Sequence, residues 1–283
     1  MKYAIRLFGE SDFEDLHRAF VDAFSSNAVR FQPKPEDFKK RIFNKLNISL
    51  ESSVIAVNEH NDIIGFSLFT IGYYEGVKAA YSGGVGVIHG YQGKGLAARM
   101  FEYSLPLLQE QKVNKIMLEV VTTNQRAVRL YERLGFTYKN RLKSFKSKNQ
   151  VKAISGEVKI RKAENWQAEY EKFWTFAPAF LDSSGHLTHN LPNETILEAT
   201  ISGRLCGYVI FQPGLGRISQ IAVAETYRNK GVGTALISKS QELSINKEIT
   251  IMNLPEDAEA SILALQKMGF RNEVDQFEME LII

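Results

Sequence analysis

The sequence predicts an α/β (α+β) protein built from two similar halves. One observation is a strand–loop–helix segment around residues 91–97 that recurs in altered form at residues 227–233. A second is that strand-like and helix-like stretches follow in the same order in both halves. A third is that the last helix of each half ends in Gly-Phe, at residues 135–136 and 269–270, which is typical of a glycine C-cap followed by a buried aromatic residue.

The composition fits two ordinary domains. The chain has 283 residues, of which 44% are hydrophobic, enough for two cores. A net charge of +3, from 35 basic and 32 acidic residues, is too small to indicate a nucleic-acid partner. The single cysteine, Cys206, excludes an internal disulfide. No stretch approaches the ~20 apolar residues of a membrane span, and the N-terminus lacks a secretion signal. We therefore expect a cytoplasmic protein with no membrane partner.

The first half reads as a complete series of strands and helices. Ser11 with Glu14 predicts the start of the first helix as an N-cap and capping-box pair. In order, the expected elements are a strand at 3–8, a helix ending near 24, a helix after 35, a hairpin of strands 53–57 and 63–71, a strand at 78–88, the loop, a helix to about 111, a strand at 116–121, a helix at 124–134 and a strand after 136.

The second half repeats this order in a shorter form. The expected elements are a strand near 158–161, a hairpin of strands 194–201 and 204–211, a strand at 218–223, the second loop, a helix at 231–243, a strand at 248–252, a helix at 256–268 and a strand from 270. We predict an N-terminal domain at 1–146, a polar linker at 147–157 and a C-terminal domain at 158–283.

Each repeated loop has the features of an anion site. It joins a strand to the start of a helix, where backbone amides lack intrahelical acceptors and the helix dipole favours negative charge. In the first copy, Gly93, Gly95 and the small Ala97 leave the backbone open to a pyrophosphate, and Lys94 adds positive charge. The loop is therefore predicted to bind phosphate groups.

Two common phosphate motifs do not describe this loop. In a P-loop reading, Ile88 stands where the first glycine belongs and Gly95 where the Ser or Thr belongs, so that reading fails. A dinucleotide fingerprint fits formally, with Ala98 as its last residue and Glu119 at roughly the expected distance. That fingerprint normally sits in the first βα unit of a domain, and Asn229 replaces its first glycine in the second copy. Both observations disfavour a nicotinamide or flavin dinucleotide.

Both copies satisfy the pattern Gln/Arg-x-x-Gly-x-Gly/Ala, as Gln92-Gly93-Lys94-Gly95-Leu96-Ala97 and Arg228-Asn229-Lys230-Gly231-Val232-Gly233. With these two loops the chain resembles the GNAT superfamily of acyl-CoA-dependent N-acetyltransferases. Residues 115–124 and 127–136 look like the fifth strand and the fourth helix of that family. The resemblance implies two GNAT-fold domains in tandem, each a mixed, mostly antiparallel sheet flanked by helices with a splayed central acetyl-CoA cleft.

The resemblance also implies direct transfer of an acetyl group from acetyl-CoA to a primary amine. Backbone groups of the fourth strand would polarise the thioester, the loop would hold the pyrophosphate and Asn124 would meet the pantetheine arm. The implied cofactor-binding residues of the first half are Val85, Val87, Gln92, Gly93, Lys94, Gly95, Leu96, Ala97, Ala98 and Asn124, and those of the second half are Arg228, Asn229, Lys230, Gly231, Val232 and Gly233.

Two side chains of the first half are implied to carry the chemistry. Tyr131 stands where the family places a tyrosine that protonates the coenzyme sulfur, and a phenol of pKa about 10 is a feasible donor to a thiolate whose acid has a pKa of about 8.5. Glu119 precedes it by the spacing of the base in the similar ribosomal-protein N-terminal alanine acetyltransferases. The alternatives are a core aromatic residue and a structural or substrate-orienting carboxylate.

The second half departs from this pattern. Leu265, Ala258 and Asn253 stand opposite Tyr131, Asn124 and Glu119 when the Gly-Phe pairs are aligned. We therefore predict catalysis in the N-terminal domain. The second loop either binds coenzyme without catalysis or is retained for packing. A non-catalytic acyl-CoA sensor or scaffold is the alternative function.

Other features are predicted to be structural. We expect no metal at His186 and His189, since no Cys or carboxylate cluster accompanies them. The aromatic residues Trp166, Tyr170, Phe173, Trp174 and Phe180 are expected to pack in a core or between domains. His89 is expected to be an exposed strand-end residue, and Glu75 and Tyr81 to border the acceptor cleft. Residues 20–50 and 72–78 would form the acceptor pocket, and their sequence leaves small-molecule amines, antibiotics, peptide N-termini and lysine side chains open.

Overall fold

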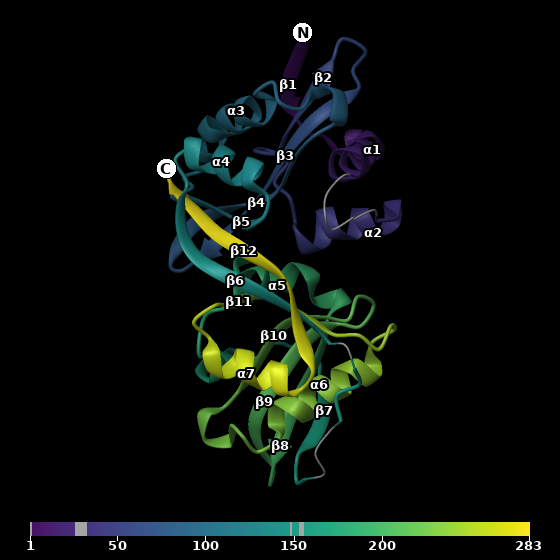
Figure 1. Ribbon diagram of the computed structural model, residues 1–283, viewed down its shortest axis with the longest axis vertical. Helices are drawn as coiled ribbons and strands as arrows, with labels where there is room; N and C mark the ends of the chain where they lie inside the picture. The colour runs from purple at the N-terminus through teal and green to yellow at the C-terminus, as the bar shows by residue number, and fades with distance from the viewer. Residues whose placement is uncertain (1, 26–32, 148, 153–155) are drawn as a thin grey trace. The chain divides into compact units, whose positions relative to one another are not determined.

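The computed structural model describes residues 2–25, 33–147, 149–152 and 156–283. Their contacts form two compact units (Figure 1). Unit 1 consists of Met1–Val120, Asn124–Tyr138 and Met279–Ile283, and unit 2 of Val121–Thr123 and Lys139–Glu278. The domain limits expected from the sequence stay a prediction. Parts of the expected linker (148 and 153–155) and of the expected acceptor segment (26–32) lie outside the described residues.

Unit 1 contains a mixed sheet whose strands lie in the order β1-β2-β3-β4-β5. The strands are β1 Tyr3–Leu7, β2 Val54–Asn58, β3 Ile63–Tyr74, β4 Val77–Val87 and β5 Lys115–Val121. Neighbouring strands are antiparallel except β4 and β5, which are parallel. A parallel pair needs a crossover connection, and here helix α3 provides it. The predicted mostly antiparallel sheet is confirmed.

Helices cover both faces of this sheet (Figure 1). They are α1 Phe13–Phe24, α2 Pro35–Lys40, α3 Leu96–Glu110 and α4 Gln125–Arg133. On one face, Leu96 and Met100 of α3 pack against Ile64 in a buried apolar cluster. On the other, the ring of Phe20 lies 4.7 Å from that of Phe38 and 5.7 Å from that of Phe66. The apolar stripes of α1 and α3 thus face the sheet, as amphipathic spacing predicts.

The predicted cap of the first helix is wrong in detail. A short 3₁₀ turn, Glu10–Asp12, precedes α1, and Asp12 rather than Ser11 provides the local hydrogen bonds. The Asp12 carboxylate accepts the Gly9 N–H at 2.9 Å and two bonds from the Arg6 guanidinium, at 2.6 and 2.8 Å. The Arg6 hydrogen bond holds the pKa of Asp12 below its usual value. A carboxylate that is paired with arginine forms stronger hydrogen bonds than a serine hydroxyl, so Asp12 rather than Ser11 stabilises this turn.

Unit 2 repeats the strand order with a different helical layer. Its strands lie in the order β6-β11-β10-β9-β8-β7, and only β10 and β11 are parallel. They are β6 Thr137–Ser147, whose first two residues belong to unit 1, β7 Lys159–Ala163, β8 Thr195–Ile201, β9 Arg204–Gln212, β10 Arg217–Val223 and β11 Thr250–Pro255. The helices are α5 Ser184–Leu187, α6 Val232–Leu243 and α7 Glu259–Lys267. Short 3₁₀ turns and α5 stand between β7 and β8, where unit 1 has α1 and α2.

The final strand, β12 Phe270–Ile282, contributes to both units. Its residues to Glu278 belong to unit 2, and those from Met279 belong to unit 1. In unit 1, Glu280 lies 3.8 Å from the Lys115 ammonium, and its carbonyl accepts the Thr137 hydroxyl at 3.3 Å. The Ile283 N–H donates to the Asn114 carbonyl at 3.0 Å.

Backbone details confirm that the two units are copies. The register of β3 with β4 shifts so that Gly83 is an extra residue, and the register of β9 with β10 shifts in the same way at Ser219. Gly95 and Gly231, which precede α3 and α6, have φ angles of 77° and 79°. Asn229 takes the left-handed conformation of Gly93, with φ of 61°, as asparagine tolerates better than most residues.

Replacing Gly86 with alanine should destabilise unit 1 by about 1–3 kcal/mol through overpacking. A Cβ at Gly86 would lie 2.3 Å from the Phe66 ring, which is fully buried and cannot move away cheaply. Gly84→Ala is the matched control, because its Cβ would meet the same ring at an ordinary 3.9 Å. Denaturant unfolding of the two variants measures the difference, and equal stabilities would contradict this packing.

Candidate active site

The sheet of unit 1 opens at its centre. Pairing between β4 and β5 ends at Tyr81 and Met117, although both strands continue, to Val87 and Val121. The predicted splay is therefore present, and Val85 and Val87 lie in the open part. Unit 2 opens in the same way, since β10 and β11 pair only up to Ile218 and Ile251. Backbone groups in such an opening need other partners, which a bound ligand can supply.

The predicted phosphate loop leads from this opening into α3. Gly93 and Gly95 both have φ of 77°, and residues 93–95 are exposed. The first helical backbone bond runs from Arg99 N–H to the Gly95 carbonyl at 3.2 Å, so the N–H groups of residues 96–98 precede the helical ladder. A Cβ at Gly95 would meet no atom within 4 Å. The loop therefore presents open space at a helix N-terminus, which suits an anion.

Polar side chains fix this loop to the strand before it. Gln92 Nε2 donates to the Val87 carbonyl at 3.0 Å, and Gln92 Oε1 accepts from Arg126 Nη1 at 2.9 Å. Lys94 Nζ donates to the Gly90 carbonyl at 2.8 Å. Sequence reasoning missed Arg126, because only the fold brings the start of α4 beside the loop.

Asn124 occupies the N-cap of α4. Its side-chain oxygen accepts the Ala127 N–H at 3.2 Å. This contact accounts for an asparagine at that position by helix capping alone. Its predicted contact with the pantetheine arm stays a prediction.

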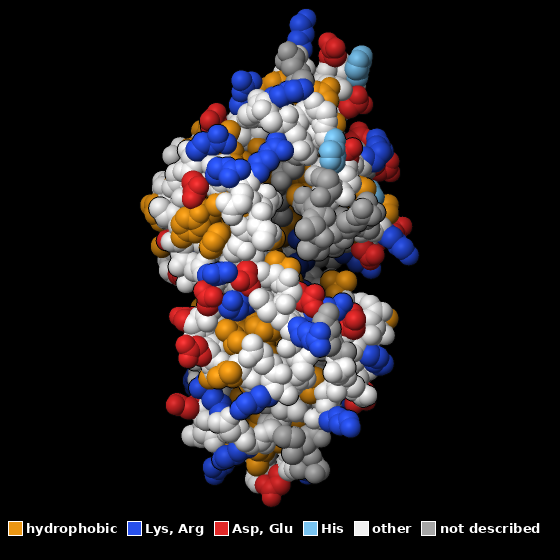
Figure 2. Space-filling view, in the orientation of Figure 1, with side chains coloured by type: hydrophobic (Ala, Val, Ile, Leu, Met, Phe, Trp, Pro, Cys, Tyr) orange, Lys and Arg blue, Asp and Glu red, His pale blue; other side chains and the backbone are white. Residues whose placement is uncertain are grey.

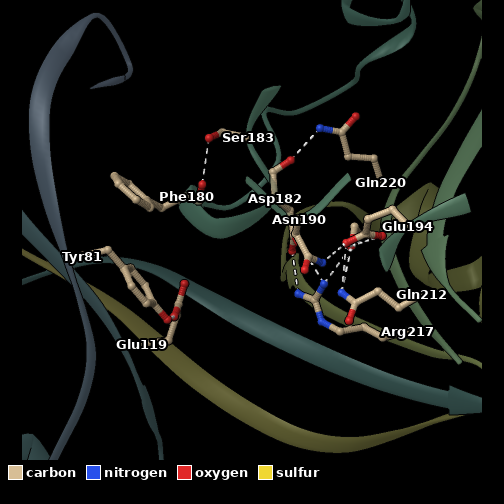
Figure 3. Close-up of polar contacts among 11 residues, drawn as sticks. Tyr81, Glu119, Phe180, Asp182, Ser183, Asn190, Glu194, Gln212, Arg217 and Gln220 are labelled. Atoms are coloured by element: carbon tan, nitrogen blue, oxygen red, sulfur yellow. Dashed lines mark hydrogen bonds and ion pairs between the residues drawn. The ribbon is translucent and has the colours of Figure 1, made fainter. Parts of the chain in front are cut away.

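Tyr81 and Glu119 meet at the point where the sheet opens (Figure 3). The Tyr81 hydroxyl donates to Glu119 Oε2. Tyr81 is buried and Glu119 partly buried, so the bond orients the carboxylate at the base of the opening. Glu75 instead accepts from the Lys115 ammonium at 2.6 Å in an ion pair near the β3–β4 turn.

Tyr131 lies on α4, with its ring 5.5 Å from that of Phe136 in an edge-to-face contact. Burial raises the pKa of Tyr131 to about 12. The group is therefore a neutral phenol at physiological pH and can donate a proton or a hydrogen bond. These properties fit both the predicted acid and the alternative of a packed aromatic residue.

The size of the kcat loss in Tyr131→Phe distinguishes these roles, and the pH dependence of that loss tests the raised pKa. A pKa raised to about 12 means that Tyr131 stays protonated, and its contribution stays constant, at every pH up to 10. We expect Tyr131→Phe to lower kcat about 10- to 100-fold, by a ratio that does not change between pH 6 and pH 10. The ratio is measured by recording kcat of the wild type and of the variant over this pH range. A ratio that falls with a midpoint below pH 10 would contradict the raised pKa.

Unit 2 carries a cavity of about 640 Å³ at the corresponding place. The second loop lines one side, and Ala258, Leu265 and Asn253 line the side where unit 1 has Asn124, Tyr131 and Glu119. Ala258 is the N-cap of α7, as Asn124 is of α4, which supports this correspondence. The cavity therefore retains the loop but lacks the phenol and the carboxylate.

The other end of this cavity is aromatic and hydrogen-bonded. Trp174 Nε1 donates to the Tyr208 hydroxyl at 2.6 Å, and that hydroxyl donates to Gln220 Oε1 at 2.9 Å. Gln220 Nε2 donates to the Asp182 carbonyl at 2.5 Å, as Figure 3 shows. Tyr170 stacks on Tyr208 at 4.1 Å, and burial raises the pKa of Tyr208 above its usual range.

The predicted aromatic segment therefore has two roles in unit 2. Tyr170 and Phe180 are fully buried, and Trp166 packs beside Tyr170. Phe173 and Trp174 pack in the same cluster and also line the cavity. The core expectation is confirmed for Tyr170 and Phe180, while Phe173 and Trp174 additionally form a wall.

The histidines lie in apolar or surface settings. His186 is buried, with its ring 5.5 Å from Phe180 and 5.4 Å from His189. His89 is exposed, as predicted, and its ring lies 3.1 Å from an Asp22 carboxylate oxygen. Within the described ranges, no group of three or more His, Cys, Asp or Glu residues could hold a metal ion. No helix there is both long and apolar enough to cross a bilayer.

Solved structures share the complete two-unit fold. A GCN5-related N-acetyltransferase from Sphaerobacter thermophilus is 14% identical, with a TM-score of 0.75, covering 99% of this chain and 95% of its own. A putative acetyltransferase from Pyrococcus horikoshii is 19% identical, with a TM-score of 0.71 and coverages of 99% and 89%. A tandem GNAT protein from the clavulanic acid biosynthesis pathway is 11% identical, with a TM-score of 0.72 and coverages of 99% and 98%. At such low sequence identity, the similarity to these structures supports a shared fold and nothing about activity.

No curated protein matches the sequence significantly. A family model described as the acetyltransferase (GNAT) family matches residues 13–136 and, separately, residues 161–270. The two matches cover most of the chain, one in each half. The protein therefore belongs to the acetyltransferase (GNAT) family and carries two GNAT domains in tandem.

Proposed function

We propose that this member of an acyltransferase family transfers an acetyl group from acetyl-CoA to a primary amine, with the chemistry in unit 1. One observation carries the proposal. Only unit 1 combines an open phosphate loop with a phenol, Tyr131, and a carboxylate, Glu119, whereas the matching positions of unit 2 hold Leu265 and Asn253.

Acetyl transfer requires three events that these residues can serve. The amine nitrogen bonds to the thioester carbon, and backbone groups near Val85 and Val87 stabilise the negative oxygen. Glu119 accepts the proton that the amine loses, directly or through a water molecule. The carbon–sulfur bond then breaks, Tyr131 donates its proton to the departing thiolate, and the proton that Glu119 accepted restores the phenol through solvent. The products are coenzyme A and the N-acetyl amine.

Transfer is direct in this scheme, without a covalent acetyl-enzyme. The only cysteine of the chain, Cys206, is fully buried on β9 of unit 2, with its sulfur donating to the Ala199 carbonyl. Burial raises the pKa of this thiol, which disfavours the reactive thiolate. Cys206 is therefore a poor nucleophile, which supports a direct attack by the amine.

Unit 2 is proposed to hold a second coenzyme through Arg228, Asn229, Lys230, Gly231, Val232 and Gly233. The support is its cavity, which combines the retained loop with mainly apolar walls. The same observation favours the alternative function, an acyl-CoA sensor or scaffold without turnover.

The test is an acetyl-transfer assay on the full chain. Purified protein is mixed with acetyl-CoA and a panel that contains small primary amines, aminoglycosides, peptides with free N-termini and lysine peptides. Released thiol and the mass of the acetylated product are both recorded. Transfer to any amine supports the proposal. Calorimetric binding of acetyl-CoA without transfer across the panel would favour the sensor.

A further inference from the structure

Arg126, the second residue of α4, lies at the phosphate loop of unit 1. Its Nη1 donates to Gln92 Oε1 at 2.9 Å, and its Nη2 would lie 4.0 Å from a Cβ placed on Gly93. Gln92 in turn donates to the Val87 carbonyl at 3.0 Å. The guanidinium therefore lies beside the backbone that the proposed function assigns to a pyrophosphate.

The charge of Arg126 is available to a ligand. The residue is exposed, and its bond to Gln92 uses one of five N–H donors. No carboxylate of the described residues forms an ion pair with it. Lys94, a cation within the loop, donates to the Gly90 carbonyl instead. Figure 2 shows basic side chains gathered over α3 and α4, which would attract a polyanion to this face.

We propose that Arg126 is a coenzyme-binding residue that holds the pyrophosphate of acetyl-CoA against the loop. A guanidinium offers paired donors that match two phosphate oxygens, and such charge-assisted bonds are stronger than neutral ones. The amides of residues 96–98 would contact the pyrophosphate from α3, and Arg126 would contact it from α4. This inference rests on the proposed coenzyme of unit 1.

Unit 2 provides an internal comparison. Ala260 stands where unit 1 has Arg126, since each is the second residue after an N-cap. Arg228 stands where unit 1 has Gln92, and its Nε donates to the Val223 carbonyl at 3.2 Å, as Gln92 does to Val87. Each loop thus has one guanidinium beside it, supplied by α4 in unit 1 and by the loop itself in unit 2. A guanidinium beside each loop, supplied from a different position in each unit, supports a role in binding phosphate.

The experiment compares three ligands by calorimetry. The full chain carries Gly231→Asp, so that the second loop contributes no binding, and Arg126→Gln is added. We expect Kd for acetyl-CoA and for acetyl-dephospho-CoA to rise about tenfold, and Kd for S-acetylpantetheine, which has no phosphate, to stay unchanged. Arg133→Gln removes the same charge from the far end of α4 and should leave all three Kd values unchanged.

Three other patterns of binding would overturn the assignment. Unchanged binding of acetyl-CoA would show that Arg126 makes no contact with phosphate. A loss confined to acetyl-CoA would place the contact at the 3′-phosphate, and an equal loss for S-acetylpantetheine would indicate a structural role. Adding Arg126→Gln to the Gln92→Ala variant separates direct binding of phosphate from support of Gln92. The loss of a direct contact weakens binding even without the Gln92 side chain, whereas the loss of support for Gln92 has no further effect. Tight binding without acetyl transfer would overturn the proposed function and leave this inference standing.

Discussion

Replacing Glu119 with glutamine is expected to lower kcat/KM at neutral pH by about 100-fold or more, which is the usual contribution of a general base. Glutamine keeps the size and one hydrogen-bond acceptor for the Tyr81 hydroxyl, so the splayed sheet should persist. It cannot accept the proton that a primary amine loses on attack. The loss should shrink at high pH, where more of the amine is already neutral in solution.

Glu102→Gln is the control for this prediction. Glu102 is an exposed carboxylate on α3, and its removal changes the net charge equally without touching the opening of the sheet. Thermal unfolding of both variants verifies that the fold is intact. Wild-type kcat/KM in Glu119→Gln would show that another group, or solvent, accepts the proton.

Replacing Gly95 with aspartate is expected to abolish coenzyme binding by unit 1. The residue has φ of 77°, which strains any side chain, and it adjoins the helix N-terminus where the pyrophosphate would lie. A carboxylate within about 4 Å of a phosphate, at an effective dielectric constant of about 20, costs enough to raise Kd at least 100-fold. Calorimetry with acetyl-CoA, together with initial rates, measures both effects.

Two variants make this result specific. Gly95→Ala introduces the backbone strain without the charge, so it should bind measurably more tightly than Gly95→Asp. Gly231→Asp places the same charge in the second loop, where φ is 79°, and should leave turnover intact if unit 1 is catalytic. Loss of turnover in Gly231→Asp but not in Gly95→Asp would move catalysis to unit 2.

Local signals explain why so much of the fold could be predicted. Gly93, Gly95 and Gly231 mark positions of positive φ in loops that lead into helices whose apolar spacing is visible in the sequence. The duplication helped further, because the pattern of one half could be checked against the other. Ser11 shows the limit of such rules. It is a favoured capping residue, yet Asp12, which is paired with Arg6, forms the hydrogen bonds before the first helix.

The geometry of the candidate site depends on contacts between residues far apart in the sequence, which local sequence patterns do not predict. Tyr81 meets Glu119, and Gln92 meets Arg126, only after strands and helices far apart in the chain have been placed. The bonded pair of Trp174 and Tyr208 in unit 2 arises in the same way. Residue types predicted the presence of a phenol and a carboxylate, whereas the partners that orient them required the three-dimensional arrangement.

The place of residues 279–283 in unit 1 affects the way in which the chain can fold during synthesis. Glu280 and Ile283 bond to Thr137 and Asn114, so unit 1 lacks these partners while unit 2 is being translated. At ordinary translation rates that interval is on the order of 10 s. Nearly all of unit 1 is therefore synthesised before unit 2, yet its sheet stays unfinished, and open to chaperones, until residues 279–283 leave the ribosome.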